Sequence, residues 1–213
     1  MTFSRSRIAL FATLFVAALV IVGVLHFSSQ KSHSAAPRAT APSAAGGTAP
    51  GLKSLHSPDR VAVDETLSAG QCKVRALDAP AGLFLPDPAC TPGAVDPAVT
   101  QANLASTICR SGYTTTVRAD TAQAKKLSLR QYGQARASST EYDHLISLQL
   151  GGTNSVSNLW PEPNRAGAPG TTNPKDATET RLNKAVCSHQ VSLAAAQKAI
   201  AGNWVTALKD LGI

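Results

Sequence analysis

Apolar and polar positions divide the chain into three stretches. Residues 8–27 form a continuous apolar block with one ionisable side chain, His26, near its end. Residues 28–69 consist mostly of Ala, Ser, Pro, Gly and Thr. From residue 70 onward, apolar positions recur at spacings typical of helices and strands. The pattern therefore predicts an apolar segment, a linker and one folded domain over residues 70–213.

The apolar block is long enough to cross a bilayer as a helix. A cleavable signal peptide usually has an apolar core of about 7 to 15 residues followed by a small-residue cleavage site. Here the core is longer, and the first plausible cleavage site lies downstream, near residues 34–36. Arg5 and Arg7 precede the block, so the positive-inside bias places residues 1–7 in the cytoplasm. We expect an uncleaved membrane anchor over residues 8–27, with a cleaved signal and a secreted domain as the alternative.

Residues 28–69 have the composition of a flexible linker. Their densest part reads APRATAPSAAGGTAPG. Such a sequence cannot bury enough apolar surface to offset the entropy cost of ordering it. We therefore expect this segment to hold the domain away from the plasma membrane.

Capping residues predict four helices in the domain. Asp96 with Pro97 opens the first, Asp120 or Thr121 the second, and Asn173 with Pro174 the third. Ser192 opens the last helical region. The four expected ranges are 96–109, 120–132, 173–186 and 192–211. Residues 113–118, YTTTVR, are rich in β-branched side chains, and this composition predicts a strand.

Charge and cysteine content narrow the class of protein. The net charge is +7 and the isoelectric point about 9.5, which excludes an acidic disordered chain. The four cysteines, Cys72, Cys90, Cys109 and Cys187, include no Cys-x-x-Cys pair, which argues against a thiolate zinc site. Outside the cytoplasm they are expected to form two disulfides, and the sequence leaves all three pairings open.

The most informative stretch is residues 141–163, EYDHLISLQLGGTNSVSNLWPEP. It contains a strand-like apolar run, a Gly-Gly-Thr-Asn turn and a second short segment that ends at prolines. His144 titrates near neutral pH and suits the role of a general base. Asp143 points to the opposite face of an extended strand and suits a hard cation.

This strand, loop, strand, helix order, with Asp143-His144 at its start and Asn158 in the return segment, resembles the ββα-metal motif of HNH (His-Me finger) endonucleases. It is similar to the variant in which Asp-His replaces His-His. The segments LPDPACTPG, TICRSGYTTTVR and AAAQKAIAGNW also resemble secreted bacterial proteins with this motif, so the likeness covers roughly residues 85–204. It implies a small, disulfide-braced α+β domain with a ββα core at about residues 141–187.

The resemblance also implies roles for individual residues. His144 would act as the base, Asn158 would hold the loop and ring of that histidine, and Asp143 would bind a divalent metal, Mg²⁺ or alternatively Mn²⁺. Many members place a closing histidine or asparagine on the helix, whereas this chain offers Asp176 and Glu179, one turn apart. Acidic residues are favoured near a helix N-terminus in any case, so a purely structural role stays open for both.

Three arginines are candidates for phosphate contacts, and the alternative for each, which the sequence favours, is an ordinary surface position. They are Arg118, Arg165 and Arg181. The expected function is that of a monomeric, metal-dependent endonuclease that acts outside the cytoplasm on DNA, with RNA left open and with low sequence specificity. The alternatives are a noncatalytic module that binds nucleic acid or the cell envelope, and a purely structural envelope protein.

Overall fold

The structure is a computed structural model that describes residues 52–54, 66–168 and 173–213. The chain divides into two units, residues 1–41 and 42–213, and the described residues all belong to the second. The predicted anchor at residues 8–27 and most of the predicted linker lie outside the described residues. Within the described ranges, no helix is long and apolar enough to cross a membrane.

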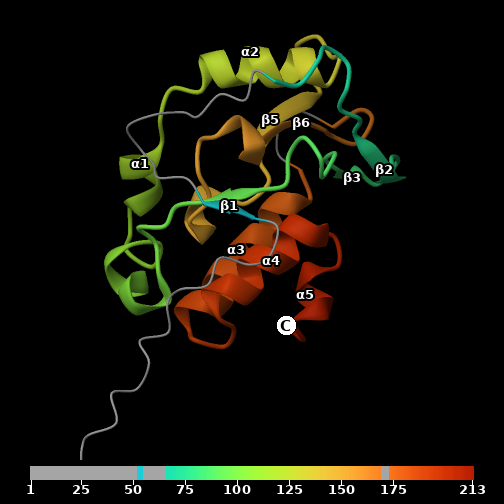
Figure 1. The fold of residues 1–213 in the computed structure, drawn as a ribbon. Helices are drawn as coiled ribbons and strands as arrows, with labels where there is room; N and C mark the ends of the chain where they lie inside the picture. Colours follow the sequence, from blue (N-terminus) through green and yellow to red (C-terminus); the bar gives the residue numbers. More distant parts are fainter. Residues whose placement is uncertain (1–51, 55–65, 169–172) are drawn as a thin grey trace, which may run out of the picture. The chain divides into compact units, whose positions relative to one another are not determined.

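The described chain has an α+β fold, as the sequence predicts, with three two-stranded sheets and several helices (Figure 1). Two sheets are antiparallel. One pairs β2 (Arg75–Asp78) with β3 (Leu83–Leu85), and the other pairs β5 (Thr140–His144) with β6 (Leu159–Pro163). The third sheet pairs β1 (Lys53–Ser54) in parallel with β4 (Ala94–Val95). Part of the segment expected to be a linker therefore contributes a strand.

The β5–β6 hairpin and helix α3 (Lys175–Cys187) follow one another in the predicted strand, loop, strand, helix order. In the hairpin, Glu141 lies opposite Glu162 and His144 opposite Leu159. The apolar run after His144 does not continue as a strand. It forms two short 3-10 helices, η2 (Leu148–Leu150) and η3 (Val156–Asn158), which carry the chain back to β6.

Helix α2 (Ala122–Gln131) packs against the hairpin on the side away from α3 (Figure 1). The Tyr142 hydroxyl donates a hydrogen bond to the Ala124 carbonyl at 2.8 Å, and the Ser128 hydroxyl donates to the Leu159 carbonyl at 3.2 Å. The predicted start of this helix is confirmed, because Asp120 Oδ1 accepts a hydrogen bond from the amide of Ala122.

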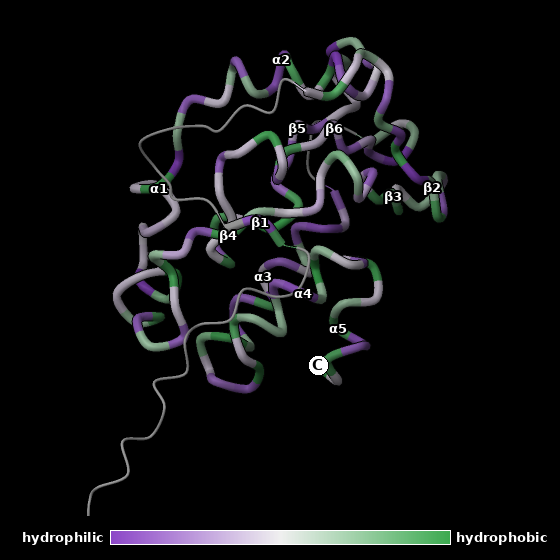
Figure 2. The backbone as a smooth tube through the Cα atoms, viewed as in Figure 1, coloured by the Kyte–Doolittle hydropathy of each residue, from purple (hydrophilic) through white to green (hydrophobic). Residues whose placement is uncertain are grey.

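Helices α4 (Leu193–Asn203) and α5 (Ala207–Asp210) pack with α3 around the largest apolar cluster of the domain. Hydrophobic and hydrophilic residues alternate along all three helices (Figure 2). The predicted cap is confirmed, since the Ser192 hydroxyl accepts a hydrogen bond from the amide of Ala195 at 3.2 Å. The predicted last helix is interrupted after Asn203, whose side-chain oxygen accepts from the amide of Val205.

Two predictions from local sequence were wrong. Residues 113–118 form a helix, α1 (Tyr113–Val117), instead of a strand. Tyr113 and Val117 lie four positions apart and are both buried in the large apolar cluster, so packing at the helical period overrides the β-propensity of this segment. The helix expected at residues 96–109 is only a 3-10 helix, η1 (Gln101–Ser106), because the Asn103 side chain bonds to the backbone of Ala98 and Thr100.

All four cysteines are paired, and the structure selects one of the three pairings left open by the sequence. Cys72 is bonded to Cys90, and Cys109 to Cys187. The second disulfide joins the segment after η1 to the C-terminal end of α3. Two disulfides indicate an oxidising, extracytoplasmic environment.

Candidate functional site

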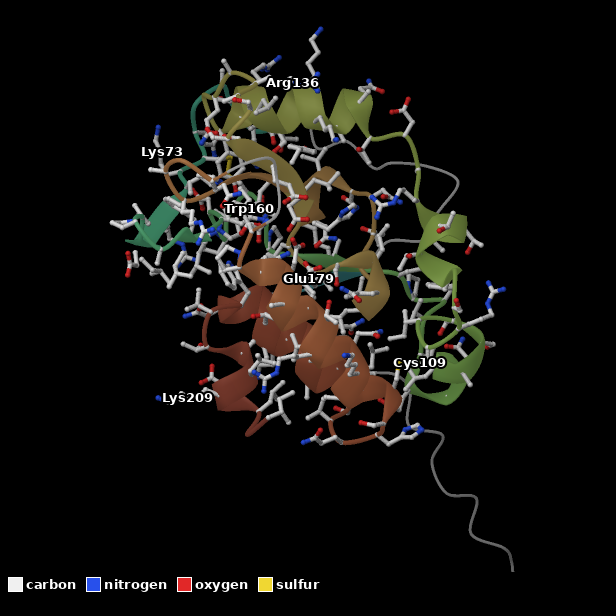
Figure 3. All side chains as sticks on the ribbon, turned by 180° about the vertical axis from the view of Figure 1, so that it is seen from behind. Lys73, Cys109, Arg136, Trp160, Glu179 and Lys209 are labelled. Carbon is white, nitrogen blue, oxygen red and sulfur yellow. A yellow bond between two sulfur atoms is a disulfide. The ribbon has the colours of Figure 1, made fainter. Side chains whose placement is uncertain are left out.

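A fully buried lysine joins the strand β5 to the helix α3. Lys175 Nζ lies 2.6 Å from Asp143 Oδ2 and 2.6 Å from the His144 carbonyl oxygen, and it also bonds to the Glu179 carboxylate. The Lys175 side chain has no solvent exposure, whereas that of Asp143 is 16% exposed. Asp143 and the helix acid Glu179 therefore converge on one cationic centre, which is the ammonium of Lys175. Figure 3 shows Glu179 on the helix and Trp160 on the neighbouring hairpin.

The carboxylates around Lys175 keep it charged. Burial alone would lower the pKa of Lys175, but the charges of Asp143 and Glu179 outweigh that effect and raise it above its ordinary value. Burial would likewise raise the pKa of Asp143, and the adjacent Lys175 lowers it instead. The two side chains therefore form an ionised pair at neutral pH.

Glu162 on β6 is a second acid of this site, and the sequence interpretation missed it. It is fully buried and lies opposite Glu141, which places both side chains on the face of the hairpin that carries Asp143. As an ionised carboxylate it finds no hydrogen-bond donor among the described residues. As a neutral acid it can donate to Asp143, and burial raises its pKa well above the usual range. The signal that could have revealed it is the strand register of the hairpin.

Two further carboxyl groups are also easier to protonate than usual. The pKa of Glu141 is raised to about 7. Burial is the larger cause, and repulsion from Asp143 is the next. Burial also raises the pKa of Glu179 to about 7, although Lys175 opposes the shift. Four carboxyl groups therefore lie around one ammonium, and repulsion among them adds to the effect of burial on these pKa values.

The His144 ring is held by Asn154, which the sequence interpretation also missed. His144 Nε2 lies 3.0 Å from Asn154 Oδ1, and the Asn154 side-chain amide donates to the carbonyl of Val117 at 2.8 Å. With the Asn154 amide group directed at Val117, its oxygen faces the ring, so Nε2 carries the proton. Nδ1 of His144 then has the free lone pair. Burial lowers the pKa of His144, which favours the neutral imidazole.

Asn158 holds the loop that follows His144 and does not bond to the ring. Its side-chain amide donates to the carbonyls of Ile146 and Thr153, both at 2.9 Å, and its oxygen accepts from the Ile146 amide at 2.9 Å. The same oxygen accepts a longer bond, 3.4 Å, from the Ala94 amide. The side chain is fully buried. Asn158 was expected to hold both the loop and the ring of His144. In the structure it bonds to the loop, and Asn154 bonds to the ring.

Asp143 and His144 open onto a cleft of about 340 Å³. The charged residues that line it are Arg118, Lys125, Glu141, Asp143, His144, Asp176 and Glu179. The cleft therefore brings together both predicted helix acids and one of the three predicted arginines. Arg181 lines a separate hollow with Lys184, and Arg165 is exposed at the surface and does not line this cleft.

The oxygen donors of the site are of the kind that a hard divalent cation prefers, but in this structure they bind the ammonium of Lys175. In the part of the chain that the structure describes, no group of three or more His, Cys, Asp or Glu side chains is arranged to hold a metal ion. However, Asp143, Glu179 and the His144 carbonyl present oxygen atoms to one point, and oxygen is the ligand that Mg²⁺ and Mn²⁺ prefer. The surplus of carboxyl groups also favours added positive charge, although Lys175 already supplies one cation there.

Comparisons of the chain with protein-family models, curated proteins and solved structures found no match.

Proposed function

We propose that the domain is a metal-dependent endonuclease that hydrolyses phosphodiester bonds of DNA outside the cytoplasm, with RNA as a second substrate class. One observation carries the proposal. His144, with its Nδ1 lone pair free, and Asp143, with an acid of α3 beside it, line one cleft together with Arg118. A base, an oxygen cluster for a cation and a phosphate-binding guanidinium are the groups that phosphodiester hydrolysis requires.

His144 is the proposed general base. Its Nδ1 atom would take a proton from the attacking water, and the neutral form needed for this step is favoured by the lowered pKa. Asn154 Oδ1 accepts a hydrogen bond from Nε2–H both before and after the proton transfer at Nδ1. This bond keeps the ring in one orientation. Asn158 fixes the backbone of the following loop, so the base stays at a constant position relative to β5.

Asp143 and Glu179 are the proposed metal ligands, with Asp176 at the edge of the same cleft. A bound Mg²⁺ or Mn²⁺ ion would offset the negative charge on the phosphate and the leaving oxygen. Arg118 is exposed on the cleft wall and can pair with a phosphate oxygen. These contacts would all be made to the sugar-phosphate backbone, which is the same for every base sequence. Cleavage should therefore show low sequence specificity.

A noncatalytic module that binds nucleic acid is the second candidate. The observation that favours it is the Lys175 ammonium, which already lies where Asp143 and Glu179 converge. A site whose acids are held by a buried lysine can keep its fold without a metal. Such a protein would retain charge-based binding to nucleic acid and would not cleave it.

The test compares His144→Asn with His189→Asn in the purified full chain, incubated with plasmid DNA and Mg²⁺ or Mn²⁺. His189 is an exposed loop histidine with φ of 60°, a conformation that asparagine tolerates, so this variant is a matched control. We expect His144→Asn to reduce nicking by about 10²-fold or more. The control should nick at the wild-type rate, and EDTA should abolish both activities. Equal, EDTA-insensitive nicking by all proteins would refute the proposal, and DNA retardation without cleavage would support the second candidate.

A further inference from the structure

A second hollow adjoins the cleft of His144, between helix α2 and strand β5. It has a volume of about 530 Å³ and shares Thr121, Lys125 and Tyr142 with the first cleft. The two hollows are therefore contiguous. None of the predicted site residues lines the second hollow, and the chemistry proposed above makes no use of it.

Positive charge dominates this second hollow. Its charged lining residues are Lys125, Lys126, Arg136 and Asp120. The three basic side chains are exposed and form no ion pair within the described ranges of the chain. Asp120 is engaged locally, because its Oδ1 atom accepts a hydrogen bond from the amide of Ala122 at the start of α2. The hollow therefore has three cationic side chains against one carboxylate, and this surplus of positive charge favours an anionic ligand.

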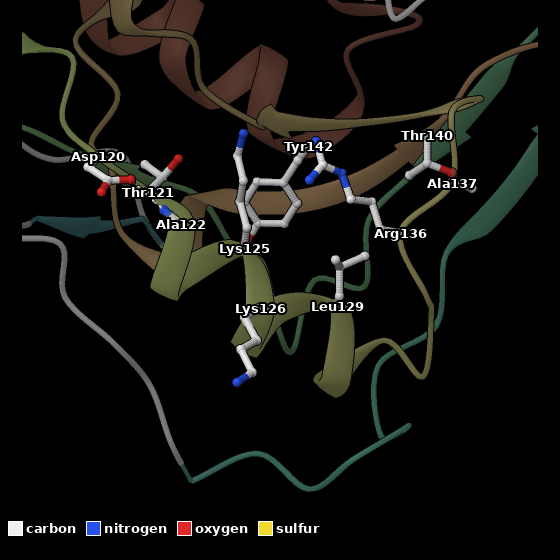
Figure 4. Close-up of a pocket in the computed structure, with 10 residues that line it drawn as sticks. All are labelled: Asp120, Thr121, Ala122, Lys125, Lys126, Leu129, Arg136, Ala137, Thr140 and Tyr142. Atoms are coloured by element: carbon white, nitrogen blue, oxygen red, sulfur yellow. Dashed lines mark hydrogen bonds between the residues drawn. The ribbon is translucent and has the colours of Figure 1, made fainter.

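Tyr142 gives this hollow a fixed floor. Its hydroxyl donates to the Ala124 carbonyl at 2.8 Å, which holds the ring against α2. Lys125 Nζ lies 5.5 Å from the centre of that ring, within the range of a cation–π contact. Figure 4 shows Lys125 and Arg136 among the side chains that line the hollow around Tyr142. With Lys125 over the ring and Arg136 lining the same hollow, phosphate groups suit this arrangement better than a stacked base does.

We propose that this hollow binds the phosphodiester backbone of a polynucleotide strand on one side of the bond that His144 attacks. The inference rests on the nuclease function proposed above and names the substrate class of the same site. Arg118 lines the first cleft with His144, Lys125 lines both hollows, and Arg136 lines the second, so basic side chains continue from one hollow into the other. A strand of several nucleotides that runs through both hollows can contact all three, whereas Arg136 does not line the cleft that an isolated phosphodiester would occupy. The protein therefore prefers long substrates to short ones.

The first test measures catalysis by the double variant Lys125→Ala/Arg136→Ala in the full chain. The substrates are a 12-nucleotide single-stranded DNA, the same sequence as RNA, and bis(4-nitrophenyl) phosphate. We expect the ratio of kcat/KM for the DNA to kcat/KM for the small diester to fall at least tenfold. Lys198→Ala is the control, since Lys198 is exposed on α4 and lines neither hollow. An equal ratio in the double variant and the control would overturn the inference while leaving the proposed function intact.

The second test measures binding without turnover. Fluorescence anisotropy of the labelled DNA is recorded at several salt concentrations, with every variant placed in the His144→Asn background. Loss of two phosphate contacts should reduce the slope of log K against log salt by about 1.4 for a single strand. An unchanged slope would overturn the inference. If wild type cleaves none of the substrates yet the slope falls as expected, the hollow is a binding surface of the noncatalytic candidate. If the wild type neither cleaves nor binds, both proposals fail.

Discussion

Lys175 Nζ and Asp143 Oδ2 lie 2.6 Å apart, in a site where the lysine is completely shielded from solvent. The pair connects the first residue of α3 to the strand that carries His144. A buried ion pair adds little net stability when it is intact, but removal of one partner leaves an uncompensated charge. This contact therefore links the start of α3 to β5 and offsets part of the negative charge of the site.

Replacement of Lys175 by methionine should destabilise the protein strongly. Asp143 and Glu179 would lose their counter-charge, and breaking a buried pair costs about 3–5 kcal/mol. Urea denaturation of Lys175→Met and wild type measures this loss. The double variant Lys175→Met/Asp143→Asn is the control, and it should lose less than the sum of the two single changes. Mg²⁺ should raise the melting temperature of Lys175→Met more than that of wild type. A Lys175→Met protein as stable as wild type would contradict the assigned contact.

Local sequence signals predicted the positions of several helices and strands, but they did not predict the residues at the centre of the site. Asp143-His144, the Gly-Gly turn and the caps of α2 and α4 are local features, and the structure places the elements they mark where the sequence predicts them. Glu162, Asn154 and Lys175 enter the site through burial and through contacts between distant segments. A charged residue in a sequence is expected at the surface, so nothing local indicates that Lys175 is buried. The strand predicted at residues 113–118 was wrong for the same reason. Packing against distant segments, and not the local sequence, determines the helical conformation of α1.

Asn158→Asp should destabilise the protein by about 2–4 kcal/mol. The variant keeps the shape of the side chain but loses the two N–H donors that bond to the carbonyls of Ile146 and Thr153. It also buries a carboxyl group against those carbonyl oxygens. Chemical denaturation and circular dichroism measure the change, with activity measured separately on the folded fraction. Wild-type stability in Asn158→Asp would show that these bonds do not hold the loop after His144.

Gly152 should not tolerate a side chain. A Cβ atom at this position would lie 1.8 Å from the Ile146 carbonyl oxygen and 2.9 Å from Asn158 Nδ2. Gly152→Ala must therefore displace the loop that Asn158 holds, and we expect severe loss of soluble, folded protein. Gly202→Ala is the matched control, because a Cβ atom there meets nothing within 4 Å and the residue lies inside α4. The control should be stabilised by about 0.4–1 kcal/mol, since alanine has less conformational freedom in the unfolded chain. Similar melting temperatures for the two variants would contradict the loop geometry.

The two disulfides should contribute unequally to stability. Cys109 and Cys187 are separated by 78 positions, and Cys72 and Cys90 by 18. In the loop-entropy treatment, these closures correspond to about 4.5 and 3 kcal/mol respectively. Cys109→Ser/Cys187→Ser should therefore lower the unfolding midpoint more than Cys72→Ser/Cys90→Ser does. The reverse order in parallel denaturation curves would show that local packing, and not loop length, governs the two contributions.

Tyr132 should make stability fall at alkaline pH. It is buried, its hydroxyl accepts a hydrogen bond from the Asp87 amide at 3.1 Å, and it lies 2.8 Å from the Thr91 hydroxyl, to which it can donate. Burial raises the pKa of Tyr132 to about 12 from an ordinary value of 10.0. The folded state therefore retains a proton that the unfolded state releases first, so its stabilising effect is complete below pH 10 and is lost as the pH rises toward 12. Relative to Tyr132→Phe, which cannot ionise, wild type should lose roughly 2–3 kcal/mol over this interval. Urea titrations of both proteins at several pH values measure the difference, and parallel pH profiles would contradict the burial assigned to this hydroxyl.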